Sequence, residues 1–595
     1  MPAAIRTVSA NCQDCYRCVR KCPIDAIWVR GGQAYVNGAL CVECGNCVRE
    51  CPQHAKVIRD GLSDVRAMIE AGETVVASVD PSFAAVFPGF RAARVPAALR
   101  MLGFAHVSEA AEGAERVAAE SARLAKANGV ACITSACAAV VSYIEKYKHP
   151  LVPYLLPVVP PMVIHGRMLK ARYGGACKVV YIGPCAAKKN KAERPGYAGA
   201  VDAVLTYDEL LRWLSDEKIN LSTCPESGFE THLPDGSAAR LTAVEGGLLR
   251  AAGIERRGLE PGILHVSGVV RVRHLLDTPP EAWDYQVVEL SFCRGGCAGG
   301  PCMPPGSDPF TAARDIYKYA ERISSEIPLW RDISEFAPHA ENTASAPGDL
   351  QEVSLQTLFK PVSIDAFLPP VDEAQIERIL AETGKGEDGT RLDCGACGYN
   401  TCRENAIAVA RGSAEPGMCS SYSRKRGERR ADRIIETSPN GIVVVGMDLT
   451  IVHMNKRFMR MFNCSSDLRG LPISHIVDAD GFEKLTAGAE GTQDAIRTRD
   501  AMKYQELIYT LPGENELIGI YVDVSATTFT NRQVDLIRGQ SLRQAQELLG
   551  HQIRFSQEMA HFLGKSTAQT EELVGRMVDL FAADDEKPGP EDETQ

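Results

Sequence analysis

Two cysteine runs of identical spacing near the start of the chain constrain its fold more than any other feature. Residues 12–23 and 41–52 both follow the pattern C-x2-C-x2-C-x3-C-P. The chain has 21 cysteines, and its first residues, MPAAIRTVSANC, lack the apolar core of an export signal. Because the cytosol keeps thiols reduced, this spacing predicts metal-binding thiolates rather than disulfides, in a cytoplasmic protein.

The doubled run resembles that of bacterial ferredoxins with two 4Fe-4S clusters. In that family three closely spaced thiolates bind one cluster, and the fourth cysteine of each run binds the other cluster. The resemblance implies one cluster held by Cys12, Cys15, Cys18 and Cys51, and another held by Cys41, Cys44, Cys47 and Cys22. A pair of zinc sites is the alternative, but zinc usually takes two C-x2-C hairpins. Residues 1–58 are therefore predicted to be a ferredoxin-like domain that carries electrons.

Length and composition exclude some classes of partner. At roughly 150 residues per domain, a chain of 595 residues can form about four domains. The net charge is −11 and the Lys and Arg residues form no basic stripe, which argues against nucleic acid as a partner. The most apolar stretch, 151–164, contains four prolines and is too short to span a bilayer. We therefore expect no membrane anchor.

Residues 59–335 have the pattern of an α/β domain. Short β-branched runs bounded by Gly or Pro predict buried parallel strands at Thr74–Val79, Gly129–Thr134, Lys178–Ile182 and Tyr285–Leu290. Helical stretches such as Ala110–Asn128 and Tyr207–Leu214 lie between the strands. Four cysteines follow these strands: Cys137, Cys185, Cys293 and Cys297. Loops at the carboxyl ends of parallel strands share a crevice, where four thiolates can hold one iron–sulfur cube.

Three cysteine-bearing strings in this domain resemble those of the iron-only, or [FeFe], hydrogenases: TSAC at 134–137, GPCAAK at 183–188 and SFCRGGC at 291–297. In that family the three motifs supply four cysteines to the H-cluster. This cofactor joins a 4Fe-4S cube, through one shared cysteine, to a diiron unit with CO, CN and a bridging dithiolate. The resemblance covers nearly all of residues 1–335 and implies an H-cluster in addition to three further 4Fe-4S clusters in the chain.

The family's site residues carry over by motif position. The implied ligands are Cys137, Cys185, Cys293 and Cys297, with Cys297 as the shared one. Lys188 matches the lysine that hydrogen-bonds a cyanide ligand, since an ammonium suits an anionic diatomic. Pro81 and Ser82 match the pair near the other cyanide. The glycines at 295–300 are expected to let the backbone approach the cofactor.

Several residues depart from the family pattern. Ala136 stands where the family usually has a cysteine that passes protons to the bridging amine, and a methyl group cannot titrate. Gly183 and Ser291 replace methionines that usually pack on the diiron unit. Asp80 replaces a small residue, and Lys191 a residue that is often Glu. These changes resemble the family's sensory branch, and they imply slow turnover.

Two points about the central domain stay open at this level. Glu245 and Glu289 are candidate carboxylates for another proton relay, although a solvated or structural role is more common for Glu. A hydrogenase-like iron–sulfur assembly factor, which keeps the cube without the diiron unit, is the rival interpretation. Lys188, the pair Pro81 and Ser82, and the glycine run all disfavour that rival.

A second kind of cluster domain is predicted after a linker at 336–370, which is rich in Ala, Pro and Ser. In residues 371–425, the cysteines of CGACGYNTC and one that follows a helical spacer resemble the small four-cysteine 4Fe-4S domain of corrinoid proteins and electron-transport complexes. The implied ligands are Cys394, Cys397, Cys402 and Cys419. Zinc is the alternative metal. The five cysteines outside these sets are predicted to be small buried side chains: Cys132, Cys177, Cys224, Cys302 and Cys464.

The remainder of the chain resembles a signalling module. Residues 426–530, which contain RIIETSPNGIVVVGMDLTIVHMNKRFMRMF, resemble a PAS domain, with strands expected at Leu507–Leu511 and Glu516–Ser525. His453 as a haem ligand and Cys464 as a redox thiol are less common roles than packing or exposure. Residues 531–580 are predicted to be a helical signalling segment, either at a dimer seam or folded back on the PAS domain. An acidic, disordered tail follows at 581–595.

Together these patterns predict a multidomain protein of mixed α/β and α+β class. The resemblances imply a slow hydrogenase that senses H2 or redox state (H2 = 2 H+ + 2 e−) and acts on a separate kinase or phosphatase. Its expected partners are H2 and protons, a redox carrier such as ferredoxin, hydrogenase maturation proteins and a second copy of the chain. The alternatives are an ordinary ferredoxin-linked or bifurcating hydrogenase, and a non-enzymatic redox sensor without the diiron unit.

Overall fold

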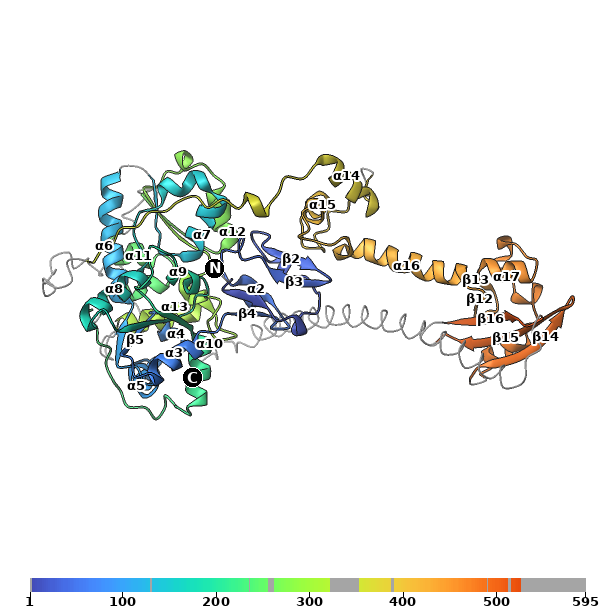
Figure 1. Ribbon diagram of the computed structural model, residues 1–595, viewed down its shortest axis with the longest axis horizontal. Coiled ribbons are helices and arrows are strands. Elements are labelled where there is room, and N and C mark those ends of the chain that lie inside the picture. The colour runs from blue at the N-terminus through green and yellow to red at the C-terminus, as the bar shows by residue number, and fades with distance from the viewer. Residues whose placement is uncertain are drawn as a thin grey trace, which may run out of the picture. The chain divides into compact units, whose positions relative to one another are not determined.

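A computed structural model of the chain describes residues 3–128, 131–234, 236–254, 262–321, 353–386, 390–488, 491–511 and 515–525 (Figure 1). The chain divides into two compact units, residues 1–426 and 427–595. Within the described residues, no helix is both long and apolar enough to cross a membrane. The predicted helical segment 531–580 and the acidic tail lie outside the described residues.

The ferredoxin-like segment is built on two small antiparallel ribbons. Strand β1 (Ile5–Thr7) pairs with β4 (Lys56–Ile58), and β2 (Ile27–Arg30) pairs with β3 (Gln33–Val36). Two short helices, α1 (Arg17–Arg20) and α2 (Asn46–Glu50), lie within the two cysteine runs. Each helix follows a residue in the left-handed region, Tyr16 at φ 53° and Gly45 at φ 75°. In each run this residue lies between the second and third cysteines, where the chain turns into the short helix.

The central domain contains two parallel sheets instead of one. The larger has the order β6-β5-β8-β9, with strands His106–Glu109, Val75–Val79, Lys178–Gly183 and Ala203–Thr206. The smaller has the order β10-β11-β7, with strands Ile263–Ser267, Val287–Ser291 and Cys132–Ile133. Three of the predicted strands correspond to β5, β8 and β11, whereas only Cys132–Ile133 of the predicted Gly129–Thr134 forms a strand, β7, and residues 129–130 lie outside the described residues. The strongly apolar character of these strands follows from burial on both faces, as in β5, where every residue is buried.

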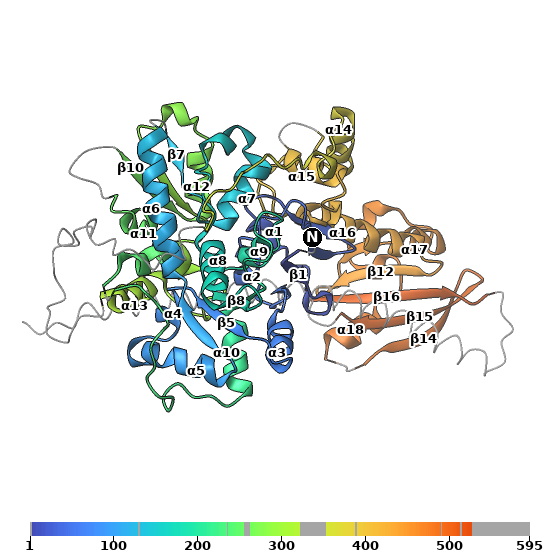
Figure 2. The same ribbon diagram turned by 60° about the vertical axis from the view of Figure 1, so that its left-hand side comes forward.

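Helices cover both sheets and close the domain (Figure 2). The predicted helices correspond to α6 (Ala111–Asn128) and α10 (Tyr207–Asp216), and α6 packs against α8 (Pro161–Tyr173). A capping box of Thr206 and Glu209 starts α10. The other helices are α3 (Leu62–Glu70), α4 (Phe83–Val86), α5 (Val95–Met101), α7 (Ala138–Tyr147), α9 (Ala187–Ala192), α11 (Gly247–Ala251), α12 (Val269–Leu276) and α13 (Pro309–Glu321).

The described part of the predicted linker, from residue 353, lies along the central domain. The amide of Val159 donates to the carbonyl of Leu355 at 2.9 Å, and that of Val362 donates to the carbonyl of Glu145 at 2.7 Å. The Phe359 ring is buried in the core that contains α7. These contacts satisfy the backbone of a segment whose composition alone indicates a flexible connection.

The four-cysteine segment follows as α14 (Glu373–Glu382) and α15 (Cys402–Ala410), which pack on each other, and α16 (Ser420–Thr437) begins directly after Cys419. This segment contacts the first ferredoxin-like run. The Arg20 guanidinium donates to the carbonyls of Ala396 and Cys15, both at 3.0 Å. The two iron–sulfur segments therefore belong to one packed body.

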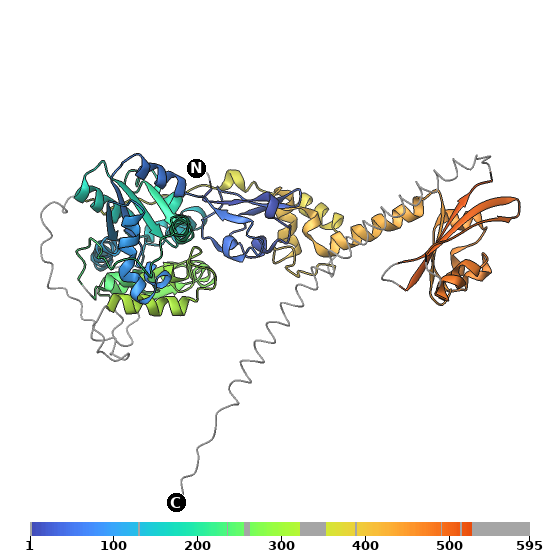
Figure 3. The ribbon, with the colours of Figure 1, turned by 90° about the horizontal axis from the view of Figure 1, so that it is seen from below.

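The second unit has the fold predicted for it, a five-stranded antiparallel sheet of order β13-β12-β16-β15-β14 (Figure 3). Its strands are Ile451–Met454, Gly441–Gly446, Glu516–Asp523, Met502–Thr510 and Gln493–Arg499. Helices α17 (Lys456–Met461) and α18 (Asp480–Thr486) contact the sheet. Asn455 starts α17 and also donates its amide to the carbonyl of Ile435 at 2.8 Å. Aromatic rings of Phe458, Phe462, Tyr504 and Tyr521 fill its core.

Candidate metal centre

Four cysteines predicted to meet do line one cavity. Cys137 follows β7, Cys185 follows β8, and Cys293 and Cys297 follow β11, so both sheets contribute their carboxyl ends. The cavity wall also includes Pro81, Ala136, Lys188 and Ser291. Two of the predicted site residues, Ser82 and Gly183, do not line it. Ser82 is buried behind the wall and hydrogen-bonds Asp80 and Tyr207.

The glycines at 295–300 pack closely against neighbouring backbone segments. A Cβ on Gly296 would lie 2.8 Å from the backbone carbon of Val244, and one on Gly300 would lie 2.7 Å from the carbonyl oxygen of Pro184. A Cβ on Gly299 would meet the carbonyl oxygen of Arg294. These glycines therefore allow close backbone-to-backbone packing, which holds the Cys293 and Cys297 loop against its neighbours. Gly296 and Gly300 also line the cavity, so the expected approach of the backbone to a cofactor stays a prediction beside this packing role.

A buried polar wall stands at one side of the cavity. Asp80 Oδ2 lies 3.0 Å from Lys188 Nζ and also accepts a hydrogen bond from the Tyr181 hydroxyl. The ammonium of Lys188 donates to that same hydroxyl. Burial opposes ionisation of Asp80, but Lys188 and the hydrogen bonds from Ser82 and Tyr181 outweigh it and lower the pKa of the carboxyl. The sequence pointed to Lys188 and Asp80, whereas Tyr181 was missed.

A carboxyl group also lines the cavity. Glu289 lines the cavity, and its carboxylate accepts hydrogen bonds from the amides of Leu248 and Leu249 at 3.4 and 2.9 Å. Burial raises the pKa of Glu289 to about 7. Glu245 lies outside the cavity wall, accepts from the Ser267 hydroxyl at 2.6 Å, and is close enough to Glu289 to raise that pKa further. The structure thus brings together the two carboxylates that the sequence indicated.

The cavity suits the donor chemistry of an iron–sulfur cube, which takes one thiolate per iron. Burial raises the pKa of Cys185 to about 11, and burial with neighbouring thiols raises that of Cys293 well above its usual value. Metal binding at such thiols releases protons. Among the described residues, no three His, Cys, Asp or Glu side chains are close enough to hold a single metal ion. Ligands of a cluster bind separate irons and so lie farther apart than ligands of one ion.

The thiols of the ferredoxin-like segment influence one another in two sets, the same sets that the resemblance implies as cluster ligands. Burial raises the pKa of Cys18 to about 11, and the thiols that add to this shift are Cys15, Cys12 and Cys51. Burial likewise raises the pKa of Cys47, and the contributing thiols are Cys41, Cys44 and Cys22. Cys44 also lines the central cavity and raises the pKa of Cys293. The second group of thiols therefore adjoins the central site.

The four cysteines of the third segment line one pocket, together with the buried residue Lys385. Lys385 Nζ lies 2.6 Å from Cys419 Sγ, and the Ser421 hydroxyl lies 3.3 Å from the same sulfur. Burial opposes ionisation of Cys419, but the contacts with Lys385 and Ser421 outweigh it and lower the pKa of this thiol. This is a site prepared for a thiolate ligand.

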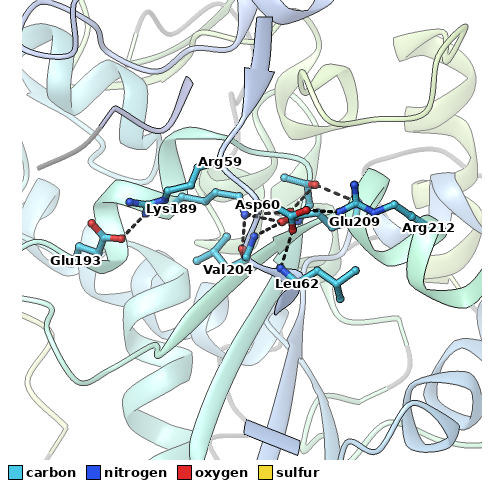
Figure 4. Close-up of polar contacts among 10 residues, drawn as sticks. Arg59, Asp60, Leu62, Lys189, Glu193, Val204, Glu209 and Arg212 are labelled. Carbon is cyan, nitrogen blue, oxygen red and sulfur yellow. Dashed lines mark hydrogen bonds and ion pairs between the residues drawn. The ribbon is translucent and has the colours of Figure 1, made fainter. Parts of the chain in front are cut away.

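Helix α9, which carries Lys188, is fixed from its other face by a buried ion pair (Figure 4). Lys189 Nζ lies 2.9 Å from Glu209 Oε2 and donates to the carbonyl of Val204 at 2.7 Å. Glu209 Oε1 also accepts the amide of Gly61 at 2.6 Å, where the ferredoxin-like segment joins the central domain. This network thus connects α9 to β9, to α10 and to the segment around Gly61.

Comparison with known proteins assigns the central domain. Residues 73–301 match the family described as iron only hydrogenase large subunit, C-terminal domain. The matched residues make up most of the central domain, which is thus similar to this hydrogenase family. Residues 11–56 match a 4Fe-4S dicluster domain, residues 391–421 match an Fe-S cluster family, and residues 429–498 match a PAS domain. The hydrogenase-family domain is therefore flanked by iron–sulfur domains and followed by a PAS domain.

Curated relatives of two kinds match parts of the chain. The NADP-reducing hydrogenase subunit HndD of Solidesulfovibrio fructosivorans is 25% identical over 264 residues, which cover 36% of this chain and 45% of that protein. The cytosolic Fe-S cluster assembly factor NAR1 of Eremothecium gossypii is 37% identical over 263 residues, with coverage of 33% and 58%. The chain thus spans less than two thirds of the length of each of these relatives.

Two solved structures are similar to parts of the chain. A variant of [FeFe]-hydrogenase HydA1 from Chlamydomonas reinhardtii is 18% identical, with a TM-score of 0.38, and covers 51% of this chain and 99% of that chain. The PAS domain of an HTR-like protein from Haloarcula marismortui is 22% identical, with a TM-score of 0.15, and covers 17% of this chain and 94% of that chain.

The two candidate ligands of the PAS domain have different surroundings. His453 Nε2 is 3.6 Å from Glu436 Oε1, and Cys464 is partly buried against the apolar core. Four of the five leftover cysteines are buried, namely Cys132, Cys177, Cys224 and Cys302, while Cys464 is only partly buried. Packing accounts for each of these side chains.

Proposed function

We propose that the chain is a slow [FeFe]-hydrogenase that reports H2 or redox state. The observation that carries the proposal is one cavity whose wall holds four thiols and the Lys188 ammonium, with a methyl group at Ala136. Cys137, Cys185, Cys293 and Cys297 would hold the H-cluster, with Cys297 shared between its two parts. When bound, the H-cluster supplies the iron site at which H2 is split or formed. Lys188 would hold an anionic ligand of the cluster by hydrogen bonding.

Proton movement would be slow in this site. Ala136 offers no titratable group where a thiol would pass protons. Glu289 lines the cavity and Glu245 lies beyond it, with its side chain 29% exposed. A proton could therefore travel from the cavity to Glu289, then to Glu245, and then to water. A relay through a carboxyl with a pKa of about 7 is suited to both directions of transfer at neutral pH.

Electrons would leave or arrive through the iron–sulfur segments. The group of Cys41, Cys44, Cys47 and Cys22 adjoins the central cavity, and the group of Cys12, Cys15, Cys18 and Cys51 lies in the same small fold. Arg20 links the first run to the loop of Cys397. A fourth cluster held by Cys394, Cys397, Cys402 and Cys419 would then be part of the same electron path.

The PAS domain would convert the state of the clusters into a signal. We infer that a separate kinase or phosphatase receives it, that maturation proteins install the diiron unit in the cytoplasm, and that the chain forms a homodimer. A redox carrier such as ferredoxin would exchange electrons with the N-terminal clusters. PAS domains in signalling proteins commonly act as such intermediaries, and coupling requires that the two cluster states favour different states of the domain.

The substitution Ala136→Cys tests the proposal that turnover is slow because position 136 has no titratable group. Installing a titratable thiol beside the cavity is expected to raise H2 turnover by a factor of about 100 or more, as positioned proton donors do. Ala136→Ser, which adds a hydroxyl of similar size, is the matched control and should leave turnover close to the parent. If the unmodified protein already turns over as fast as Ala136→Cys, the sensory interpretation is wrong.

A second candidate is an iron–sulfur protein without the diiron unit. Matches to proteins named as Fe-S cluster assembly factors favour it, as does the engagement of Lys188 by Asp80. Infrared bands of iron-bound CO and CN separate this candidate from both kinds of hydrogenase. A partner enzyme whose activity is the same under H2 and under inert gas would instead favour an ordinary catalytic hydrogenase.

A further inference from the structure

Position 183 has no room for a side chain, because the Tyr181 ring fills the space. A Cβ on Gly183 would lie 2.8 Å from Tyr181 Cε1, 3.1 Å from the Tyr181 hydroxyl and 3.0 Å from Asp80 Cβ. Residues 181 and 183 are two apart on β8, so their side chains point to the same face. The backbone of Gly183 has no positive φ, so its conformation does not require glycine. Packing against Tyr181 and Asp80 is therefore what selects glycine here.

The space taken by Tyr181 gives its hydroxyl two charged partners. The hydroxyl donates to Asp80 Oδ2 and accepts from the Lys188 ammonium. Asp80 Oδ1 in turn accepts from the amide and hydroxyl of Ser82 at 3.0 and 2.5 Å. Each oxygen of the Asp80 carboxylate thus accepts two hydrogen bonds. Asp80, Tyr181 and Lys188 all line the cavity that holds the four thiols.

Asp80, Tyr181 and Lys188 together carry no net charge. One carboxylate and one ammonium face each other 3.0 Å apart in a buried site. Two of the three ammonium protons are directed at Asp80 and Tyr181, which leaves one for a group in the cavity. A lysine without these partners would offer three protons and a full positive charge. In a site screened from water this difference acts strongly on a nearby anionic group.

We propose that Asp80 and Tyr181 are positioning residues for the Lys188 ammonium. They orient it toward the anionic ligands of the metal group, and the carboxylate of Asp80 offsets its positive charge there. Gly183 is needed because a side chain at this position would occupy the space of the Tyr181 ring. This inference rests on the proposed function for its target, since those ligands belong to the H-cluster. Its steric half concerns only residues of the chain.

The electrostatic half is tested on the cluster-loaded full chain. Asp80→Asn keeps the shape of the side chain and removes its charge, so the ammonium is no longer cancelled. The CO and CN stretching bands are expected to shift to higher frequency, and the reduction potential of the metal group to rise. Tyr181→Phe should shift the CN bands less, because it removes one hydrogen bond and no charge. Unchanged bands and potential in Asp80→Asn would overturn the proposal.

Tyr197→Phe is the matched control for this experiment. Tyr197 is as buried as Tyr181 and its hydroxyl accepts from Thr357 at 3.3 Å, but it does not line the cavity. Its loss should leave the infrared bands and the potential unchanged. Bands that move equally in Tyr197→Phe and Tyr181→Phe would show a general structural response and would overturn the specific role of Tyr181.

The steric half is tested without the diiron unit, by a double-mutant cycle on unfolding of the full chain. Gly183→Met should lower the unfolding midpoint in the parent and cost much less in a Tyr181→Ala background, where the space is free. Equal costs in both backgrounds would overturn the packing argument. If CO and CN bands are missing altogether, the proposed function fails, while the cycle still decides whether Gly183 and Tyr181 are coupled.

Discussion

The buried ion pair of Lys189 and Glu209 gives the most quantitative prediction. Both side chains are almost fully buried, with 3% and 8% of their surface exposed. Lys189→Met keeps much of the volume of the side chain and removes its charge. The carboxylate of Glu209 would keep neutral donors, the amide of Gly61 and the amide and hydroxyl of Thr206, but no cation. The carbonyl of Val204 would lose a partner as well.

Removing one partner of a buried pair costs about 3–5 kcal/mol, because it leaves an uncompensated charge. The neighbouring pair of Arg212 and Asp60 is a matched control, since its side chains are 53% and 50% exposed. Arg212→Met should therefore cost only about 0.2–1 kcal/mol. Each pair has one partner on α10: Glu209 is paired with Lys189 of α9, and Arg212 is paired with Asp60, just before α3 (Figure 4). The two pairs therefore differ chiefly in burial.

Hydrogen exchange of residues 203–216, which form β9 and α10, is the appropriate assay. A loss of 3 kcal/mol in opening free energy corresponds to exchange that is faster by about 100-fold, as each 1.4 kcal/mol is a factor of ten. Arg212→Met should change exchange by a factor of about five or less. If the two variants exchange at the same rate, the argument from burial is refuted.

Two further predictions concern pH and potential. Burial raises the pKa of Glu289 from 4.5 to about 7, so between these pH values the folded state keeps a proton that the unfolded state releases. The contribution of Glu289 to the free energy of unfolding should therefore fall by about 3 kcal/mol as pH rises from 4.5 to 7. Glu289→Gln should remove that pH dependence in denaturant unfolding at pH 5 and 8, and an unchanged slope would contradict it. Lys385→Met should lower the potential of the cluster at Cys419 in an electron paramagnetic resonance redox titration, whereas the exposed control Lys318→Met should not. Equal potentials in the parent and in Lys385→Met would contradict a role for that ammonium.

Periodicity and cysteine spacing predicted much of the fold. The runs Thr74–Val79 and Lys178–Ile182 correspond to β5 and β8 because strands buried on both faces must be continuously apolar. The sequence did not reveal that β8 belongs to one sheet and that β7 and β11 belong to another. Strand neighbours depend on contacts between distant segments, and a run of Val and Ile is compatible with either sheet.

The sequence indicated the four cysteines that line the candidate site, but it did not indicate Tyr181, which also lines the cavity. The cysteines could be identified because each lies in a recognisable local string, and the three strings carry one, one and two of the four thiols. Tyr181 carries no such pattern, and its role depends on Asp80, a hundred residues away in the chain. One local signal was available, namely a glycine two positions after a tyrosine on a strand that leads to Cys185. Such a pair indicates a large side chain that covers an empty neighbour.

The reason for the glycine run also depended on tertiary contacts. Sequence alone indicates that small residues at 295–300 allow something to approach closely. The structure shows that the partners are the backbones of Val244, Arg294 and Pro184. Composition likewise indicated a flexible connection at 353–370, whereas Phe359 and the backbone of Leu355 contact the central domain.

The central claim is that the cavity of Cys137, Cys185, Cys293 and Cys297 holds a cube with a diiron unit beside Ala136. The most direct test is the infrared spectrum of the full chain after maturation, with iron content confirming that its cysteine sites are loaded. We expect bands of CO and CN bound to iron, which shift on exposure to H2. A loaded protein without those bands would contradict the account.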